Sequence, residues 1–371
     1  MEKRQFSSIK RLVIKVGSSS LTYATGKLNI EQIEKLVRQM ADLHNSGMEV
    51  LLVSSGAVGT GLGKLGLDKK RRTMPEKQAA AAIGQGMLLH MYEKVFAEYG
   101  VVVGQVLLTR EDFADRRRFL NARNTLQAML DFNVVPVINE NDTVAVDEIK
   151  LGDNDNLAAM VGGLVDAGLL ILLSDVDGLY DGDPGRPDSR LLNEVYEINS
   201  DIESLAKGAG SKMGTGGMTT KIQAARIAMY SGLVTVIARA SEDNVVRRIV
   251  AGEPLGTTFW PSARLVQKKK WIAYGATVCG QIKVDGGAVR ALQKGGKSLL
   301  PSGVTAVRGG FDVGNTVSVV DADGNEIARG IVNYCAADVD KIKGCKTGEI
   351  AGILGHKDYD EIIHRDNLAL E

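Results

Sequence analysis

The sequence predicts an α/β protein, in which a mainly parallel β-sheet lies between layers of helices and is followed by a small β-rich domain. Six short runs are apolar throughout instead of alternating, which is typical of strands buried on both faces of a parallel sheet. Segments with helical periodicity separate these runs, and such alternation over about 255 residues predicts helices on both faces. The six predicted strands are "RLVIKVG" (11–17), "EVLLVSSG" (49–56), "VVVGQVLLT" (101–109), "VVPVIN" (134–139), "LLILLSD" (169–175) and "VTVIA" (234–238).

Four segments between these runs are predicted to be helices. The first has apolar residues at helical spacing, such as Ile33, Leu36 and Met40. The second begins with Pro75, which favours the first turn of a helix, and is rich in alanine, the residue with the highest helix propensity. The other two have a similar pattern. The four segments are residues 30–46, 75–97, 112–131 and 219–231.

A change of texture at residues 254–271 indicates where the first domain ends. The stretch "PLGTTFWPSARLVQKKKW" contains two prolines and three consecutive lysines, which favour a linker. Beyond it, short apolar runs are separated by turn sequences such as "DGG", "KGG" and "DADGN", as in a β-rich domain. We therefore predict a first domain at 1–258, a linker at 259–272 and a second domain at 273–371.

Composition excludes several classes of protein. The 371 residues have a net charge of zero, so overall charge does not attract the chain to nucleic acid or acidic lipid. The three cysteines form no CxxC pair, which argues against a disulfide framework and a zinc ribbon. The N-terminus lacks the apolar core of a signal peptide, and no apolar stretch reaches the ~18 residues of a membrane helix. We therefore expect a soluble, cytoplasmic protein.

Polar residues follow the first two predicted strands, at the strand ends where ligands of parallel sheets bind. Lys15 lies inside the first strand and Gly17 follows it. Its ammonium group could face a phosphate, although an edge lysine before a polar turn fits equally well. Ser54, Ser55 and Gly56 form a predicted strand-to-helix corner, where backbone N–H groups could hold an anion.

A glycine-rich stretch, Gly61–Gly66, matches the pattern GxGxxG. We exclude a dinucleotide site because the match begins about seven residues after the strand instead of directly after it. The pattern of a P-loop also fails, since Leu65 follows Lys64 and position 58 is not glycine. We therefore predict a glycine-rich loop here.

Residues 134–156, "VVPVINENDTVAVDEIKLGDNDN", concentrate acids and amides after a predicted strand. A calcium loop starting at Asp153 is excluded, because its fifth and sixth positions are leucine and alanine. One interpretation is a helix start capped by Asp153 or Asn154. The other is a pocket for a small zwitterion, with carboxylates binding its ammonium and amides or helix N–H groups binding its carboxylate. We favour the pocket, with capping also present, and expect Asn139–Asp142 and Asn154–Asp155 to form its walls.

Two further motifs could contact a ligand. Ser174, Asp175 and Asp177 follow the apolar run in "LLILLSDVDGLYDGDP", which is either a plain turn or a ligand contact. In "GSKMGTGGMTTK" a glycine loop precedes a predicted helix, which Thr219 or Thr220 could cap. Lys221 lies in the first turn, where a cation is unfavourable to the helix dipole, so a bound polyphosphate would offset it.

These motifs, in their order along residues 12–225, resemble the amino-acid kinase superfamily, and within it most closely the members that phosphorylate L-glutamate. The most specific part is "NEND" followed by "GDNDNL". Residues 271–360, with "KSLLPSGV" and "VRGGFDVGNTVSV", look like a PUA domain. The five motifs are "VIKVGSSSLT", "LVSSGAV", "VINENDTVAVDEIKLGDNDNLAA", "LLSDVDGLY" and "MGTGGMTTKIQAA".

The resemblance implies a fold, a reaction and several partners. The fold is a three-layer αβα sandwich around a mainly parallel eight-stranded sheet, followed by the PUA domain. The reaction is ATP-dependent phosphorylation of the side-chain carboxylate of L-glutamate to L-glutamyl 5-phosphate, the first step of proline synthesis, with Mg²⁺. The resemblance also implies feedback inhibition by proline, a homo-oligomer (a dimer or tetramer), and transfer of the labile product to glutamate-5-semialdehyde dehydrogenase.

Motif by motif, the resemblance also implies roles for single residues. Lys15 and Lys221 would neutralise the transferring phosphoryl group, and Asp155 would hold these lysines in place. The carboxylates that contact Mg²⁺ are not assigned. Glutamate would bind to Ser55, Asp142 and Asn154, and the nucleotide to Lys15, Ser174, Asp175, Thr215, Gly216, Gly217, Met218, Thr219, Thr220 and Lys221.

The chemistry of these residue types agrees with such a reaction. A glutamate side chain has a pKa near 4.3, so it is already ionised at pH 7 and needs no general base. The protein has to position two anions in line and offset their charge, which lysines, Mg²⁺ and N–H donors do. The absence of histidine from the motifs is therefore expected.

Three alternatives stay open. A sister kinase could act on aspartate, N-acetylglutamate, carbamate or a nucleoside monophosphate, although Asp142 would have no ammonium to bind in N-acetylglutamate. RNA could bind the C-terminal domain, but residues 268–371 contain 14 Lys+Arg against 13 Asp+Glu, without the basic excess of RNA-binding domains. A regulatory protein without activity is disfavoured, since both Lys15 and Lys221 are present.

Overall fold

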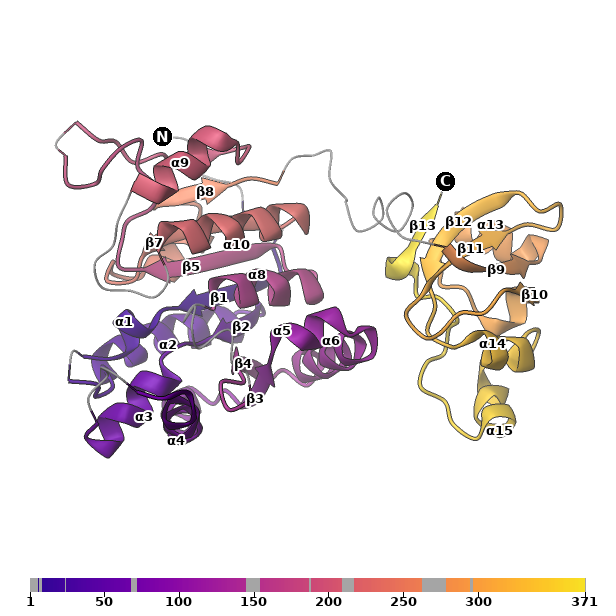
Figure 1. Ribbon diagram of the computed structural model, residues 1–371, viewed down its shortest axis with the longest axis horizontal. Helices are drawn as coiled ribbons and strands as arrows, with labels where there is room; N and C mark the ends of the chain where they lie inside the picture. Colours follow the sequence, from indigo (N-terminus) through magenta and orange to yellow (C-terminus); the bar gives the residue numbers. More distant parts are fainter. Residues whose placement is uncertain are drawn as a thin grey trace. The chain divides into compact units, whose positions relative to one another are not determined.

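The computed structural model divides the chain into two compact units, Met1–Ala263 and Arg264–Glu371 (Figure 1). Each unit has a hydrophobic core of its own. The division falls inside the predicted linker at 259–272, most of which lies outside the described residues. The structure describes residues 6, 9–23, 25–67, 72–144, 154–186, 188–208, 217–261, 278–293 and 296–370.

The first unit is built around one eight-stranded sheet. Its strands are β1 (Arg11–Val16), β2 (Glu49–Val53), β3 (Val103–Leu108), β4 (Val135–Glu140), β5 (Leu169–Ser174), β6 (Glu194–Val195), β7 (Val234–Arg239) and β8 (Thr257–Phe259). They lie in the order β3-β4-β2-β1-β5-β7-β8-β6, and every pair is parallel except β7 with β8. This confirms the mainly parallel eight-stranded sheet, and all six predicted strands are present.

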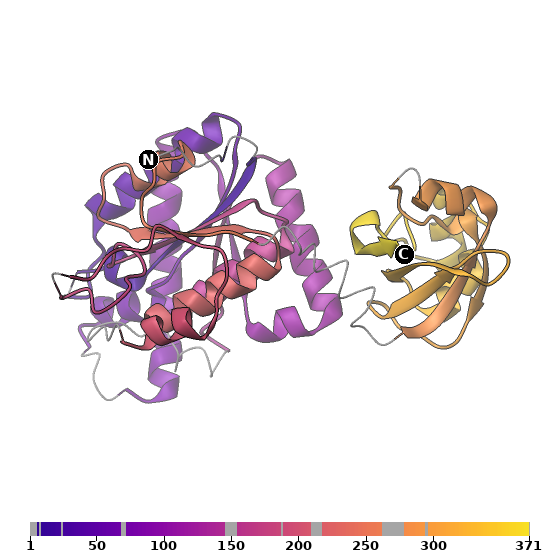
Figure 2. The same ribbon diagram turned by 90° about the horizontal axis from the view of Figure 1, so that it is seen from above.

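Helices cover both faces of the sheet (Figures 1 and 2). They are α1 (Ser18–Leu21), α2 (Ile30–Asn45), α3 (Ala57–Leu65), α4 (Met74–Ala97), α5 (Arg110–Ala114), α6 (Arg116–Asp131), α8 (Asp155–Leu164), α9 (Ser200–Gly208), α10 (Met218–Tyr230) and α11 (Val245–Val250). Leu12 and Ile14 of β1 belong to a core with α2, α4 and α11, whereas Val13 belongs to a second core with α6, α8 and α10. Successive strand residues point to opposite faces, so a strand covered on both sides has to be apolar throughout.

The predicted start of the linker is wrong. Residues 257–259 form β8, which pairs antiparallel with β7 and parallel with β6. Phe259 is fully buried, and the backbone N–H of Trp260 donates to the carbonyl of Val195 at 2.9 Å. The first unit therefore extends past residue 258. A strand of three residues between two prolines is too short to show a periodicity of its own.

We predicted a loop for the glycine-rich stretch Gly61–Gly66, and this prediction is wrong. The stretch forms the second half of α3 and its C-cap. A Cβ added to Gly61 would lie 1.8 Å from the carbonyl oxygen of Ala80 in α4. A Cβ added to Gly84 would lie 1.8 Å from the carbonyl oxygen of Ala57 in α3. The glycines therefore allow α3 and α4 to approach backbone to backbone, which overrides their low helix propensity.

The second unit contains a five-stranded sheet in the order β10-β9-β11-β12-β13, which confirms the predicted β-rich domain. Buried side chains such as Ile282, Val317 and Ile363 form its core. Its strands are β9 (Val278–Val284), β10 (Val304–Arg308), β11 (Thr316–Val320), β12 (Glu326–Ile331) and β13 (Leu368–Leu370). Its helical segments are α13 (Gly286–Gln293), η2 (Pro301–Gly303), α14 (Ala336–Ile342), η3 (Thr347–Glu349), α15 (Ile350–Leu354) and η4 (Arg365–Asn367).

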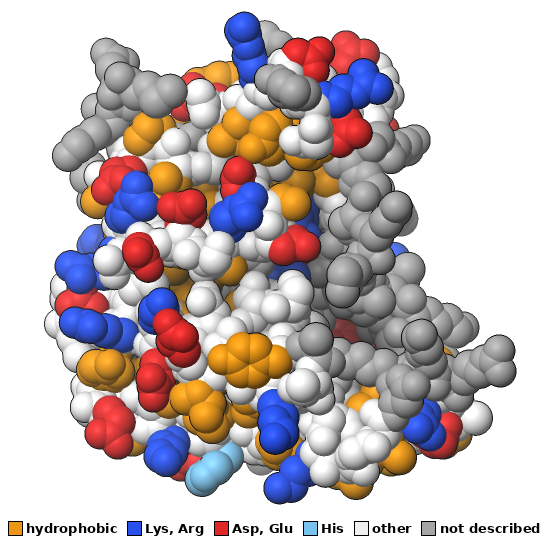
Figure 3. Space-filling view, turned by 90° about the vertical axis from the view of Figure 1, so that its left-hand side faces the viewer, with side chains coloured by type: hydrophobic (Ala, Val, Ile, Leu, Met, Phe, Trp, Pro, Cys, Tyr) orange, Lys and Arg blue, Asp and Glu red, His pale blue; other side chains and the backbone are white. Residues whose placement is uncertain are grey.

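The surface mixes charges of both signs. On the face drawn in Figure 3, the described acidic and basic side chains are interspersed, in keeping with the net charge of zero. Within the described part of the chain, no helix combines the length and the apolar character that crossing a membrane requires.

The contact between α3 and α4 predicts opposite effects for two glycines of α4. In Gly84→Ala the new methyl group would collide with the backbone of α3, so we expect the free energy of unfolding to fall by at least ~2 kcal/mol. In Gly86→Ala nothing lies within 4 Å of the new methyl group, and stability should be unchanged or rise by up to about 1 kcal/mol. Urea denaturation of both variants tests this, and equal effects would contradict the close contact.

Candidate active site

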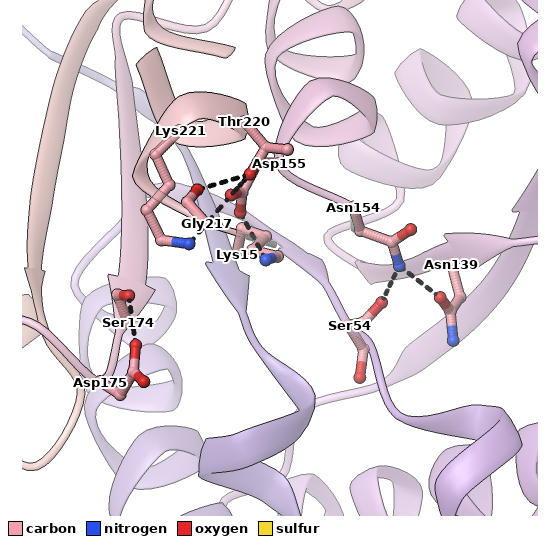
Figure 4. A network of polar contacts seen from close by, with 10 residues as sticks. All are labelled: Lys15, Ser54, Asn139, Asn154, Asp155, Ser174, Asp175, Gly217, Thr220 and Lys221. Carbon is pink, nitrogen blue, oxygen red and sulfur yellow. Dashed lines mark hydrogen bonds and ion pairs between the residues drawn. The ribbon is translucent and has the colours of Figure 1, made fainter. Parts of the chain in front are cut away.

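Three charged side chains form a buried cluster beyond the carboxyl end of β1 (Figure 4). The Asp155 carboxylate pairs with the Lys15 ammonium through Oδ1 and with the Lys221 ammonium through Oδ2, the latter at 3.2 Å. The Asp155 side chain is 0% exposed, and the two lysine side chains are 4% and 7% exposed. Residues that are far apart in the sequence therefore meet in one place.

Three different elements position this cluster. Lys15 is the last residue but one of β1, which lies between β2 and β5 in the middle of the sheet. Asp155 is the first residue of α8, a position at which the helix dipole favours an acid. Lys221 lies in the first turn of α10, where a cation opposes the dipole. Asp155 supplies the negative charge that this lysine needs within the protein itself.

The start of α10 differs from the predicted one. The helix begins at Met218, after Gly217 as the N-cap residue, so the prediction that Thr219 or Thr220 caps it is wrong. The Thr220 hydroxyl donates to the carbonyl of Gly217 at 2.8 Å and lies 3.3 Å from Asp155 Oδ2 (Figure 4). Thr220 therefore links the first turn of α10 to the buried carboxylate.

A pocket lies between the end of β5 and the start of α10, next to the charged cluster. At the end of β5, Ser174 Oγ donates to Asp175 Oδ1 at 3.0 Å (Figure 4). Thr215 and Gly216, which were also predicted to bind the nucleotide, lie outside the described residues. The pocket lining includes five of the predicted residues: Ser174, Asp175, Gly217, Met218 and Lys221.

A second polar cluster borders the same pocket; the sequence indicated Asp177 at this strand end but not its partners Tyr180 and Arg239. Asp177 accepts hydrogen bonds from Arg239 Nε and from the Tyr180 hydroxyl, the latter at 3.0 Å. The Arg239 guanidinium lowers the pKa of Asp177 from its usual value. Burial, and then the neighbouring Asp177, raise the pKa of Tyr180. Arg239 is the last residue of β7, so its place at a strand end was the signal available in the sequence.

The predicted walls of the substrate pocket also meet. Asn154 is the N-cap residue of α8, but its side chain does not cap the helix, so the capping interpretation is wrong for it. Its amide nitrogen Nδ2 donates to the carbonyl of Ser54 at 2.5 Å and to Asn139 Oδ1 at 2.6 Å (Figure 4). The amide groups of Asn139, near the end of β4, and of Asn154, just before α8, therefore contact each other next to the end of β2.

The remaining predicted substrate residues lie at neighbouring strand ends. Ser55 follows β2 and is buried, and its hydroxyl oxygen has no hydrogen-bond partner among the described residues. Asp142 lies in the turn that follows β4, the strand next to β2. Gly56 then starts α3 in the left-handed conformation, with φ of 94°, which a glycine adopts without strain.

Two side chains of α4 reach the site, although the sequence gave only an alanine-rich helix there. Gln85 Nε2 donates to the carbonyl of Glu140 at 2.9 Å. The hydroxyl groups of Tyr92 and Ser54 are hydrogen-bonded at 3.0 Å, and burial raises the pKa of Tyr92 well above its usual range. The signal available in the sequence was a glutamine and a tyrosine within an alanine-rich helix.

Comparison with known proteins shows the class of this chain. The model of the amino acid kinase family matches residues 10–239, and the model of the PUA domain matches residues 280–354. The chain belongs to the amino acid kinase family.

Individual relatives give a narrower picture. The chain is 58% identical to a glutamate 5-kinase of Caldanaerobacter subterraneus subsp. tengcongensis, over 97% of each chain. It is 58% identical to a glutamate 5-kinase of Moorella thermoacetica, over 98% of this chain and 96% of the relative. It is 48% identical to a glutamate 5-kinase of Syntrophus aciditrophicus, over 98% and 94%.

Removing the shared carboxylate should destabilise the protein. In Asp155→Asn both lysines stay buried while the negative charge between them is gone. We expect the free energy of unfolding to fall by about 3–5 kcal/mol at pH 7, as for other broken buried ion pairs. Urea denaturation at pH 7 measures this.

Asp177→Asn is the matched control, because it removes an acid whose side chain is 37% exposed and whose partner Arg239 is 42% exposed. Its effect at pH 7 should stay within about 1 kcal/mol. Since the pKa of Asp177 is lowered, the contribution of this pair is present above about pH 4 and is lost as the pH falls. Equal losses in the two variants would contradict the buried cluster.

Proposed function

We propose that this chain catalyses the ATP-dependent phosphorylation of the L-glutamate side chain and forms L-glutamyl 5-phosphate. This is the reaction of a glutamate 5-kinase (EC 2.7.2.11), the first step of proline synthesis. Relatives with that name match over almost the whole chain, which supports the substrate. The family match supports phosphoryl transfer. The observation that carries the proposal is that Lys15 and Lys221 share the buried carboxylate of Asp155.

The charge of the cluster suits a transferring phosphoryl group. Two lysines and one aspartate sum to a charge of +1, at the sheet edge where ligands of parallel sheets bind. In the transition state the phosphoryl group spreads negative charge over three oxygens. Ammonium groups fixed in a buried site stabilise that charge more than mobile water does, because they need no reorganisation. Asp155 reduces the repulsion between the two lysines and fixes their positions.

The glutamate carboxylate, which accepts the phosphoryl group, needs no general base. The side-chain carboxylate of glutamate is ionised at pH 7, so no group has to remove a proton from it. The protein instead has to bring two anions together in line and hold them. Asp142 is assigned to the substrate ammonium. The buried Ser55 hydroxyl supports a contact to the substrate, because buried hydroxyl groups ordinarily have a hydrogen-bond partner.

The pocket beside Lys221 is assigned to the nucleotide. Ser174 and Asp175 form one of its sides, and Gly217 and Met218 form another. Among the described residues, no group of three His, Cys, Asp or Glu side chains is arranged to hold a metal ion. Mg²⁺ ordinarily binds to one or two carboxylates and to substrate phosphates, so we expect it to bind together with ATP. It would supply further positive charge to the transferring group.

The proposal also covers the location, oligomeric state and regulation of the protein. We assign the chain to the cytoplasm and expect a homo-oligomer, inhibition by proline, and transfer of the product to glutamate-5-semialdehyde dehydrogenase. A sister kinase that acts on aspartate or N-acetylglutamate is the alternative. Hydroxylamine traps an acyl phosphate as a hydroxamate, so parallel assays with the three acids distinguish these substrates.

Lys221→Ala should lower kcat far more than it raises the KM for glutamate, because charge compensation matters most in the transition state. We expect kcat to fall by at least ~100-fold. Glutamate-dependent hydroxamate formation with saturating ATP measures both constants. A large change in KM with kcat intact would contradict the role assigned to Lys221.

Asp142→Ala should show the reverse pattern. Because Asp142 is assigned to the substrate ammonium, its removal weakens binding in the ground state and transition state alike. We expect the KM for glutamate to rise by at least ~10-fold with a smaller change in kcat. The same assay measures it, and an unchanged KM would show that Asp142 does not bind the substrate.

A further inference from the structure

Three buried amide side chains form a continuous chain of hydrogen bonds from α4 to the substrate pocket. Gln85 Nε2 donates to the carbonyl of Glu140, and Gln85 Oε1 accepts from Asn139 Nδ2 at 3.0 Å. Asn139 Oδ1 accepts from the backbone N–H of Glu140 at 2.9 Å and from Asn154 Nδ2 at 2.6 Å. Asn154 Nδ2 also donates to the carbonyl of Ser54. We name Gln85, Asn139 and Asn154 the amide relay.

The direction of the amide relay is fixed at both ends. A backbone carbonyl can only accept, so the carbonyls of Glu140 and Ser54 require a nitrogen from Gln85 and from Asn154 respectively. Asn139 then has to donate to Gln85 and accept from Asn154. Turning any one of the three amides over would place two acceptors or two donors against each other.

This direction determines which atom Asn154 offers to a ligand. Both hydrogens of its amide nitrogen are used, so its remaining polar atom is Oδ1, an acceptor. L-glutamate at pH 7 has two carboxylates, which only accept, and one ammonium, which donates. In this orientation Asn154 would pair with the ammonium, whereas from the sequence we expected amides of this stretch to bind the substrate carboxylate.

We propose that Gln85 is a positioning residue, which fixes the Asn154 amide with its oxygen toward the substrate ammonium and so selects for an amino acid over a plain dicarboxylate. This inference rests on the proposed binding of glutamate at Asn154. Gln85 acts through Asn139 and Asn154.

Packing holds Gln85 in place. It is 6% exposed, and the preceding residue, Gly84, lies against the backbone of Ala57 in α3. Two turns further along α4, the Tyr92 hydroxyl contacts Ser54, whose carbonyl is the last acceptor of the amide relay. The helix that carries Gln85 is therefore tied to the strand end that receives Asn154.

Without Gln85, the nitrogen of Asn139 loses its acceptor, and only the backbone N–H of Glu140 then holds the Asn139 amide. Asn154 keeps its bond to the Ser54 carbonyl but loses a firmly held partner at Asn139, so its Oδ1 is positioned less precisely for the substrate ammonium. In Gln85→Leu we expect the KM for L-glutamate to rise by at least ~10-fold, with a change of less than about twofold in the KM for ATP. Glutarate lacks the ammonium, so the ratio of its KM to the KM for L-glutamate should decrease by a similar factor.

Gln85→Glu is a second variant of almost the same shape. Its carboxylate cannot donate to the Glu140 carbonyl but still accepts from Asn139 Nδ2, so it should raise the glutamate KM less than Gln85→Leu does while preserving the packing. The matched control is Gln39→Leu. Gln39 is also 6% exposed and bonds to the backbone of Lys35 and Val246, away from the site. Its removal should leave both KM values and the preference over glutarate unchanged.

A double-mutant cycle with Asn154→Ala tests whether Gln85 acts through Asn154. Residues that act through one contact are not additive, so Gln85→Leu should change the glutamate KM less than about twofold in the Asn154→Ala background. Full additivity, or an unchanged glutamate KM in the folded Gln85→Leu variant, would overturn the proposal. No glutamate-dependent hydroxamate with the wild-type chain would instead overturn the proposed function on which it rests.

Discussion

One buried carboxylate, that of Asp155, places a strict condition on the first unit. Two ammonium groups, of Lys15 and Lys221, lie in the interior, and removing a charge from water is unfavourable unless another charge pairs with it. The carboxylate can meet both lysines only if the start of α8, the end of β1 and the start of α10 come together. The order of strands in the sheet and the packing of these helices satisfy that condition.

In the proposed reaction, the same condition would keep positive charge in place before any substrate binds. A phosphoryl group in transfer needs positive charge at fixed positions, and a rigid pair of lysines supplies it without reorganisation. If the lysines were held by solvent alone, they would be mobile and would repel each other. In the proposed reaction Asp155 therefore links stability to chemistry: it pairs two buried charges and holds one of them, that of Lys221, at the pocket beside β5.

The packing of α4 against α3 supports the proposed substrate site, although it lies away from the proposed reacting groups. The backbone contact at Gly84 brings α4 against α3, and this places Gln85 and Tyr92 over the ends of β2 and β4. The amide relay then extends that order to Asn154. The helix α4, which the sequence showed only as an alanine-rich segment, thus supports the proposed substrate site.

The strands and long helices could be predicted because burial on two faces leaves a local pattern of apolar residues. The end of the first unit and the helix at Gly61–Gly66 could not be predicted in this way. The strand β8 is defined by its pairing with β7, and Gly61 is required by its close contact with the carbonyl of Ala80 in another helix. Lys15, Asp155 and Lys221 were found from motifs, but their mutual contact depends on the whole sheet. The partners of Asn154 are Ser54, 100 residues away along the chain, and Asn139, 15 residues away, so rules for local helix capping could not predict them.

The most direct test of the account is the rate of phosphoryl transfer in a single turnover by Asp155→Asn, compared with the wild-type chain and with glutamate binding measured separately. If the shared carboxylate organises the two lysines for the transition state, the rate constant falls by at least ~100-fold while the affinity for glutamate changes by less than about threefold. A folded variant that transfers the phosphoryl group at the wild-type rate would contradict the central role of Asp155.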